Sequence, residues 1–409
     1  MFGHDPHEPP PAPQSIPIIG HMIGLSQSKV SYYVNLSLSR AQKTYVVTKP
    51  EPILAVQKKH KTLAFPPIEA KFAPTVCGAS LGAQSILNKN VDDGDEGDFG
   101  LSMESYAAMR AGLKPGPQLE DMNRIVIREI TRSLDTLQPA EGKSRKIGLY
   151  SWIRDVATTA TTRSVYGLTN PYDDNAIADA FWEFESGLMS ILKVAKAFEA
   201  YSKAGEVGWN FNCYHGKHVT CGFLDSILVH SHPGLLGDIR KEIDAYTETV
   251  TENGSTVKTL NITALKESCP LLLSSCQEVL RYCSMETSIL SRIIQQNVNL
   301  QGSDVTHFNP RRFLREEKQY RLRDVCFRAF GDDKNPCPGR HFATNEILAV
   351  VAAFIAGLDM KPVNGGWKLP TTANTNVAAV IMESNDDIEV KIRTRQGFED
   401  IKWAIDLDK

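Results

Sequence analysis

The sequence predicts a mainly helical fold with a small β region, and three observations carry this prediction. Apolar residues recur at helical spacing through most of the middle of the 409-residue chain. Short runs rich in β-branched residues, bounded by turn-forming residues, gather after Lys361. A composition of 42% hydrophobic and 23% charged residues is that of a globular protein. A chain of this length can bury a core large enough to enclose a cofactor.

The N-terminal part combines a stiff segment with a strand and a helix. Residues 1–20 are rich in proline, which favours an extended chain. Thr44–Thr48 (TYVVT) is predicted to be a strand, and Pro50 opens a helix that continues to about His60. We interpret the acidic run at 91–98 (VDDGDEGD) as a solvated loop.

The middle of the chain is predicted to be strongly helical. Its apolar positions follow a period near 3.6, and Gly167 is placed to end one of the helices. The predicted helices span Leu119–Leu137, Tyr150–Tyr166, Ala178–Ala200, Leu235–Tyr246 and Ile262–Ser284.

The C-terminal part contains a buried helix followed by strands. The apolar run Ile347–Leu358 is shorter than the roughly 20 residues that span a bilayer, so it is predicted to be a core helix. Asn376–Met382 and Ile388–Arg393 are predicted strands, separated by a turn at Ser384–Asp387.

Charge and cysteine content exclude some classes of protein. With 45 basic and 48 acidic residues the formal net charge is −3, which gives no support for nucleic-acid binding. The eight cysteines are scattered along a long chain and form no compact disulfide framework, so a reducing compartment is expected. The N-terminus shows no secretory signal.

The segment Phe330–Ala343 (FGDDKNPCPGRHFA) carries the most informative chemistry. Cys337 precedes an apolar helix, and a helix N-terminus favours the ionised form of a neighbouring thiol. Gly339 has no Cβ and lets the backbone approach a flat cofactor closely. Phe330 can cover the sulfur and limit its contact with water. The pattern favours a metal-binding thiolate over a free cysteine at the start of a core helix.

The order Phe330, Cys337, Gly339, Phe342, Ala343 resembles the haem-binding signature of the cytochrome P-450 monooxygenases. The resemblance implies their fold, a helical haem-binding domain with minor sheets. It also implies haem b as cofactor, with the Cys337 thiolate as axial iron ligand and its electron donation favouring O–O cleavage. Segments that resemble fungal members are YVVTKPE, SWIRDVATTATTRSVYG, HPGLLGDIRKEI and TTANTNVAAVIME.

Two features distinguish the chain from the usual pattern of this family. Asn335 stands where members often carry an Arg or His that binds a haem propionate, and branches resembling sterol 7-hydroxylases and prostacyclin synthases also lack that basic residue. The chain looks shortened between Ala41 and Thr44 and between Leu300 and Phe308, so an incomplete fold is expected.

Arg292 matches in position an arginine that often meets a propionate, with an exposed strand arginine as the alternative.

Glu278 and Arg281 lie three residues apart in a predicted helix and share one face. Apolar neighbours make this helix largely buried, and a buried ion pair needs further partners to offset its desolvation. Arg312, in Pro310–Phe313, is a candidate partner. The arrangement resembles the family's Glu-x-x-Arg helix and Pro-x-Arg-Phe segment, which implies that Glu278, Arg281 and Arg312 form a structural triad.

The domain organisation and the partners follow from the same resemblance. We expect a Pro-rich segment at 1–20, a haem domain at 21–395 and a tail at 396–409. The implied reaction is hydroxylation of an apolar small molecule by dioxygen in fungal secondary metabolism. Electrons are expected from a separate NADPH-dependent reductase, since no flavin or nicotinamide motif occurs. The expected location is the cytoplasmic side of the endoplasmic reticulum; membrane association stays open, because no transmembrane anchor is visible.

Two features of the region before His230 leave alternatives open. Cys213, His215, His218 and Cys221 include two sulfur and two nitrogen ligands of the kind that zinc accepts, although a loop or helix end is the simpler interpretation. The family's central helix carries an acid or Asn beside a Thr, whereas here Gly222–His230 resembles only its tail, and Thr220 alone could supply the hydroxyl. Alternatives are therefore a haem-thiolate isomerase or dehydratase that needs no external electrons, and a truncated non-catalytic remnant.

Overall fold

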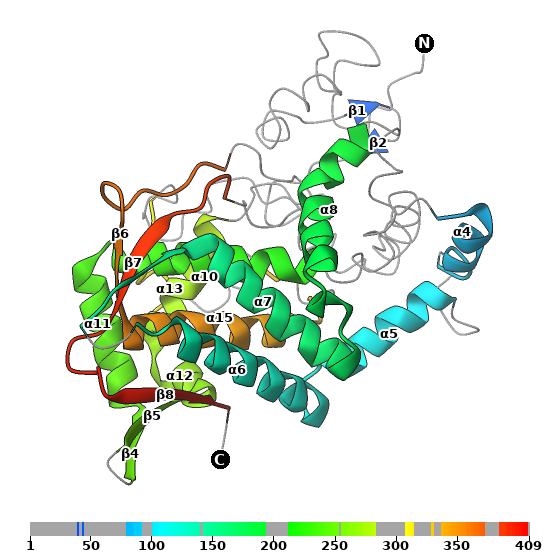
Figure 1. Cartoon of the computed structure of the whole chain (residues 1–409). Helices are drawn as coiled ribbons and strands as arrows, with labels where there is room; N and C mark the ends of the chain where they lie inside the picture. The colour runs from blue at the N-terminus through cyan, green and yellow to red at the C-terminus, as the bar shows by residue number, and fades with distance from the viewer. Residues whose placement is uncertain are drawn as a thin grey trace.

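The computed structural model describes residues 39–40, 43–44, 79–91, 100–139, 142–193, 212–252, 255–283, 307–314, 329–330, 337–372 and 384–407. The described chain is mostly helical, with two three-stranded sheets beside the helices (Figure 1) and a two-stranded pair, β1 (Ser39–Arg40) and β2 (Lys43–Thr44). This confirms the mainly helical fold class with a small β region.

Two long helices, α6 (Pro117–Leu137) and α7 (Leu149–Tyr166), pack against each other, and both agree closely with the predicted spans. A proline occupies the first turn of α6, where its missing N–H costs no hydrogen bond. Gly167 follows α7 with φ of 63°, a left-handed conformation that glycine adopts without a steric penalty.

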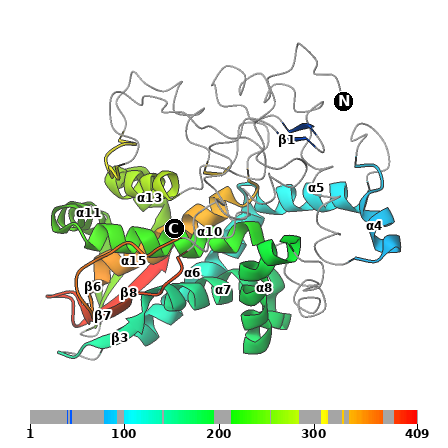
Figure 2. The same ribbon diagram turned by 90° about the horizontal axis from the view of Figure 1, so that it is seen from above.

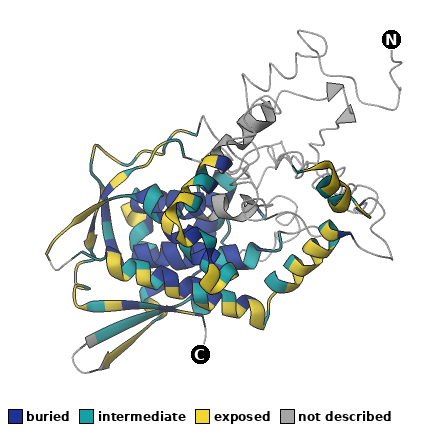
Figure 3. Ribbon diagram, turned by 45° about the vertical axis from the view of Figure 1, so that its right-hand side comes forward, coloured by how far each residue is buried: buried dark blue, intermediate teal, exposed yellow. Residues whose placement is uncertain are grey.

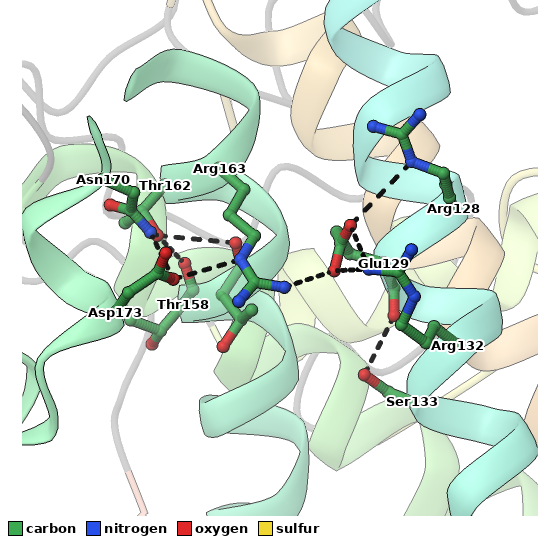
Figure 4. Close-up of polar contacts among 10 residues, drawn as sticks. Arg128, Glu129, Arg132, Ser133, Thr158, Thr162, Arg163, Asn170 and Asp173 are labelled. Atoms are coloured by element: carbon green, nitrogen blue, oxygen red, sulfur yellow. Dashed lines mark hydrogen bonds and ion pairs between the residues drawn. The ribbon is translucent and has the colours of Figure 1, made fainter. Parts of the chain in front are cut away.

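A polar network ties α6 to α7 and to the turn that follows α7. Glu129 of α6 is nearly buried, and its carboxylate accepts from Arg132 Nη1 at 3.0 Å and Arg163 Nη1 at 2.7 Å. Arg163 also donates through Nε to Asp173 at 3.1 Å. Asn170 donates to the same aspartate and to a threonine of α7. Figure 4 shows that Arg163 lies between the two acids and so links all three elements.

The centre of the fold is α15 (Arg340–Gly357), which packs against α6 and α10 (Asn212–His230). Every residue of 345–357 is buried, which confirms the predicted core helix; it ends at Gly357 rather than at Leu358. Figure 3 shows that buried positions gather in these central helices. Gly222–His230, which resembles the tail of the family's central helix, forms the C-terminal part of α10, and the helix begins ten residues earlier in a stretch with no proline.

The predicted helix Ile262–Ser284 is two helices, α12 (Ile262–Ser268) and α13 (Pro270–Tyr282). Pro270 has no N–H to continue a helix and disfavours the helical conformation of the residue before it. Glu242 of α11 (Pro233–Ala245) then accepts hydrogen bonds from the Leu271 and Leu272 amides at the new N-terminus. The break is therefore built into the sequence and satisfied by a neighbouring helix.

One sheet is antiparallel, in the order β3 (Arg145–Gly148), β7 (Glu389–Thr394), β6 (Leu358–Pro362). Its central strand confirms the prediction at 388–393. Asp387, just before β7, accepts from the Tyr150 and Ser151 amides and so caps the N-terminus of α7. The small sheet thus joins the C-terminal part of the chain to the first long helices.

The other sheet contains a hairpin that was not predicted. β4 (Thr247–Glu252) pairs antiparallel with β5 (Ser255–Asn261), and β8 (Ile401–Asp406) pairs parallel with β5. β8 belongs to the segment 396–409. Trp403 and Ile405 of this strand, and Leu407 just after it, reach the core. Figure 1 and Figure 2 both show the strands of the two sheets on one side of the helices.

The remaining described elements lie toward the periphery. α4 (Leu81–Leu87) and α5 (Leu101–Leu113) contain no buried residue, and α8 (Asn175–Lys193) corresponds to the predicted helix from Ala178. Within the described ranges, none of the helices is both apolar enough and long enough to cross a bilayer. The expected elements outside those ranges are the Pro-rich segment 1–20, most of 44–48, the helix 50–60 and the strand 376–382.

We predict that Gly357→Ala lowers the free energy of unfolding by about 1–3 kcal/mol. A Cβ at this position would lie 2.9 Å from Nε1 of the buried Trp403, so the core must shift to accept it. Gly112→Ala in α5 is the matched control, because nothing lies within 4 Å of the added carbon. It should raise stability by up to ~1 kcal/mol. Equal effects of the two variants in urea unfolding would contradict the close packing of α15 against β8.

Candidate functional site

Cys337 lies immediately before α15, two residues ahead of the N-cap residue Gly339. Its amide donates to the Phe330 carbonyl oxygen at 2.7 Å, and its own carbonyl accepts from the Arg340 amide at 3.2 Å. The first bond closes the loop and brings Phe330 and Cys337 together. The Phe330 side chain is partly buried and packs against the core.

The surroundings of Cys337 favour negative charge. The free amides at the N-terminus of a long helix carry a partial positive charge. Arg340, the first helical residue, donates through Nη1 to the Cys337 carbonyl oxygen at 3.3 Å. This bond holds the positively charged guanidinium close to the Cys337 backbone. This end of α15 can therefore stabilise an anionic ligand.

Partial exposure distinguishes Cys337 from the other cysteines that the structure describes. Cys337 is half-buried, whereas Cys221, Cys269, Cys276 and Cys283 are all buried. Burial raises the pKa of Cys269 and Cys283 to about 12, and it raises the pKa of Cys221 and Cys276 well above the usual value of a thiol, so these four thiols stay protonated at neutral pH. Among the described cysteines, Cys337 alone combines access with an electropositive environment.

This donor set fits a haem. The described residues contain no cluster of three or more His, Cys, Asp or Glu side chains able to hold a bare metal ion. A haem iron is held by its porphyrin and needs a single axial protein ligand, for which a thiolate suffices. A lone accessible cysteine at the mouth of a buried helix matches that requirement.

Glu278 of α13 is fully buried and is the centre of an ion-pair cluster. Arg281 binds its carboxylate with two bonds, Nε at 2.7 Å and Nη2 at 2.8 Å, and Arg312 adds a third through Nε at 2.9 Å. The Asn309 amide donates at 2.8 Å. Both arginines also donate to the His307 carbonyl. These contacts offset the desolvation of the buried carboxylate and hold the segment 307–314 against α13.

Two of the sequence-predicted site residues are less well defined. Arg292 lies outside the described residues. Gly339 has φ of −81°, a conformation open to any residue, so its backbone alone does not require glycine. The structure thus brings together Phe330 with Cys337, and Glu278 with Arg281 and Arg312.

A buried acid between α10 and α13 was missed in the sequence. Asp225 is fully buried and accepts from Ser275 Oγ at 3.0 Å and from the Cys276 thiol at 2.8 Å. Burial raises its pKa from 3.8 to about 6. Cys221 and Cys283 lie close enough to interact with it electrostatically, and both are protonated. An acid at an apolar helix position, one turn after Cys221, was the available signal.

The zinc hypothesis concerns α10 itself. Cys213, His215 and His218 lie on this helix, but their side chains are outside the described part of the structure. Cys221 is buried beside Asp225. Thr220 is also buried, and its hydroxyl has no hydrogen-bond partner in the described chain.

We predict that Glu278→Ala lowers the free energy of unfolding by about 3–5 kcal/mol, because two arginines then remain without their shared anion. Arg312 is 4% and Arg281 18% exposed, so solvent screens them little. The control is Asp121→Ala, which breaks an ion pair of the same i,i+3 spacing in which Asp121 is 74% and Arg124 59% exposed. It should change stability by less than about 0.5 kcal/mol. Denaturant unfolding that gave the two variants the same loss would contradict the account of the cluster.

We predict a pH-dependent effect of Asp225→Asn. Because the pKa of Asp225 is raised to about 6 in the folded protein, its protonated form stabilises the fold below about pH 4, and this contribution is lost as the pH rises through 6. The variant should therefore gain stability relative to the wild type between pH 4 and 7, on the order of 3 kcal/mol. Unfolding curves of both proteins across this range measure the gain; a difference that stays constant with pH would refute it.

Comparison with known proteins places these features in context. No protein-family model matches the chain. It is 29% identical to the cytochrome P-450 monooxygenase nodJ of Hypoxylon pulicicidum over an alignment of 490 residues. The alignment covers 98% of this chain and 92% of the relative. It is 22% identical over 491 residues to a cytochrome P-450 monooxygenase of Gibberella zeae, covering 98% and 91%. A shorter similarity, 26% over 195 residues, joins 42% of the chain to 36% of the monooxygenase ausG of Penicillium brasilianum.

These relatives are all fungal cytochrome P-450 monooxygenases, and the similarity to two of them extends over nearly the whole chain. They support an oxidoreductase enzyme and imply a haem cofactor and a redox partner, as the cysteine loop had indicated.

Proposed function

We propose that the chain is a haem-thiolate monooxygenase that hydroxylates an apolar small molecule in fungal secondary metabolism. The observation that carries the proposal is the placement of Cys337, the accessible cysteine of the described chain, at the N-terminus of a helix buried on all sides. The similarity to fungal cytochrome P-450 monooxygenases over nearly the full chain supports it.

The chain's residues have distinct roles in this proposal. Cys337 would hold the iron of haem b through its thiolate, Phe330 would limit the contact of its sulfur with water, and Gly339 would permit the close approach of the backbone. Arg292 meets a propionate. The cluster of Glu278, Arg281 and Arg312 holds the scaffold behind the haem; its support is the dense set of bonds to the buried carboxylate.

Bound haem supplies the activation of dioxygen. In the overall reaction one oxygen atom enters a substrate C–H bond and the other is reduced to water, which consumes two electrons and two protons. An NADPH-dependent reductase on the cytoplasmic side of the endoplasmic reticulum supplies the electrons in this proposal. Thr220 is the candidate for proton delivery, because its buried hydroxyl is bonded to no other group of the described chain.

The chain is also proposed to be shortened internally relative to its relatives. The alignment with nodJ extends over 490 residues although this chain has 409, so stretches of the relative have no counterpart here. Placement near the sterol 7-hydroxylase and prostacyclin synthase-like branch rests on Asn335.

A second candidate function is a haem-thiolate isomerase or dehydratase that needs no external electrons. One observation favours it: Thr220 is flanked in α10 by Val219 and Cys221, with no acid or amide beside it. Dependence of substrate turnover on NADPH and reductase separates the two candidates.

We predict that the haem-loaded, reduced protein shows a red-shifted, thiolate-type Soret band when carbon monoxide is added, and that Cys337→Ala abolishes this band. Cys269→Ala is the control, because Cys269 is buried and should leave the spectrum unchanged. A wild-type protein without the band would contradict the monooxygenase and the isomerase alike and favour a non-catalytic remnant.

A further inference from the structure

The rotation of α15 about its own axis is poorly determined by apolar burial. Every residue of 345–357 is buried, so the helix presents no exposed face that would distinguish one rotation from another. For a helix that is apolar all round, the apolar area that is buried changes little when the helix rotates about its axis. Specific polar contacts are then needed to select one of them.

Glu346 and Asn345 are the polar residues of this buried stretch, and they contact different helices. Glu346 is 1% exposed, and its two carboxylate oxygens accept from Thr161 Oγ1 of α7 at 2.9 and 3.1 Å. Asn345 Oδ1 accepts from Lys266 Nζ of α12 at 3.0 Å. Adjacent residues point about 100° apart around a helix. The two contacts therefore fix the rotation of α15 from two directions.

The Glu346 contact lies at the end of α15 that carries the cysteine. At the other end, Phe354 packs edge-on against Trp152 of α7 with ring centroids 5.1 Å apart. The pairs Thr161–Glu346 and Trp152–Phe354 show that α7 and α15 run antiparallel. The hydroxyl–carboxylate bond is therefore the α7 contact nearer to Cys337.

A small rotation would matter at the metal. The Cα atoms of a helix lie about 2.3 Å from its axis, so a turn of roughly 20° displaces them by ~0.8 Å. Metal–ligand distances tolerate only about 0.2 Å. Burying a carboxylate is unfavourable unless it is well bonded, which makes Glu346 a costly way to stabilise a core and an effective way to specify its geometry.

We propose that Glu346, through the Thr161 hydroxyl, is a positioning residue that fixes the rotation of α15 and thereby places the Cys337 sulfur for axial ligation. The Asn345–Lys266 contact is the second point of this constraint. The inference rests on the proposed function, because it assigns a purpose to the contact at the same haem site.

The test uses the full-length haem-loaded protein, reduced and saturated with carbon monoxide. The measured quantity is the ratio of thiolate-type to non-thiolate Soret absorbance. Thr161→Val keeps the shape of the side chain but removes the hydroxyl, and it should lower the ratio roughly fivefold, as expected for the loss of one hydrogen bond. Thr161→Ser restores the hydroxyl and should return the ratio to the wild-type value.

Thr344→Val is the matched control. The Thr344 hydroxyl bonds only within α15, to the Arg340 carbonyl at 2.7 Å, among the contacts that the structure describes. Its removal should leave the ratio unchanged. A wild-type ratio in Thr161→Val, or an equal loss in Thr344→Val, overturns the inference.

Circular dichroism establishes whether each variant folds. If Thr161→Val does not fold, Lys266→Met replaces it, and an unchanged ratio in that variant overturns the two-point constraint. A wild-type protein that lacks the thiolate-type band contradicts the proposed function as well, whereas a normal wild-type band with an insensitive Thr161→Val contradicts only the positioning role.

Discussion

The hydrogen bond from the Cys337 amide to the Phe330 carbonyl closes a loop at the N-terminus of α15, a helix that is buried throughout 345–357. This constraint determines much of what the site can do. It holds Cys337 at the end of the helix where the free amides and Arg340 favour negative charge, and it brings the backbone of Phe330 next to that of Cys337. The remaining described cysteines are buried, which keeps their thiols protonated, so among the described cysteines Cys337 is the accessible one.

Buried polar groups form a second level of organisation around this helix. Glu129, Glu278 and Glu346 each accept hydrogen bonds from side chains of other elements, and Asp225 does so between α10 and α13. Each contact joins one helix to another part of the fold at a defined position: Glu278 joins α13 to the segment 307–314, and the other acids join pairs of helices. Such groups add less to stability than apolar residues of the same size, but they reduce the number of alternative packings.

The sequence predicted the elements that have a strong local signal. The 3.6-residue period of α6 and α7 gave their bounds closely, and Gly167 marked the end of α7. The helix at 262–284 was predicted as one piece because its apolar period continues through Pro270, whose missing N–H breaks it. The β4–β5 hairpin was missed, although Asn253-Gly254 between two threonine-rich runs is a turn signal. The pairing of β8 with β5 joins residues far apart in sequence and could not be inferred from local pattern.

The same distinction applies to the site. Spacing placed Glu278 and Arg281 on one helix face, and the resemblance to the family's Pro-x-Arg-Phe segment implied that Arg312 joins them. Asp225 and Glu346 could not be assigned partners from sequence, since Ser275 and Thr161 lie on other helices. A buried acid is visible in a sequence as a break in an apolar run, but its partner depends on tertiary packing.

The most direct test of the central claim is X-ray absorption at the iron edge of the purified, haem-loaded protein. The account predicts one sulfur atom in the iron coordination sphere of the wild type and none in Cys337→Ala. A coordination sphere of nitrogen and oxygen alone in the wild type, or a sulfur ligand that persists in the variant, would contradict it.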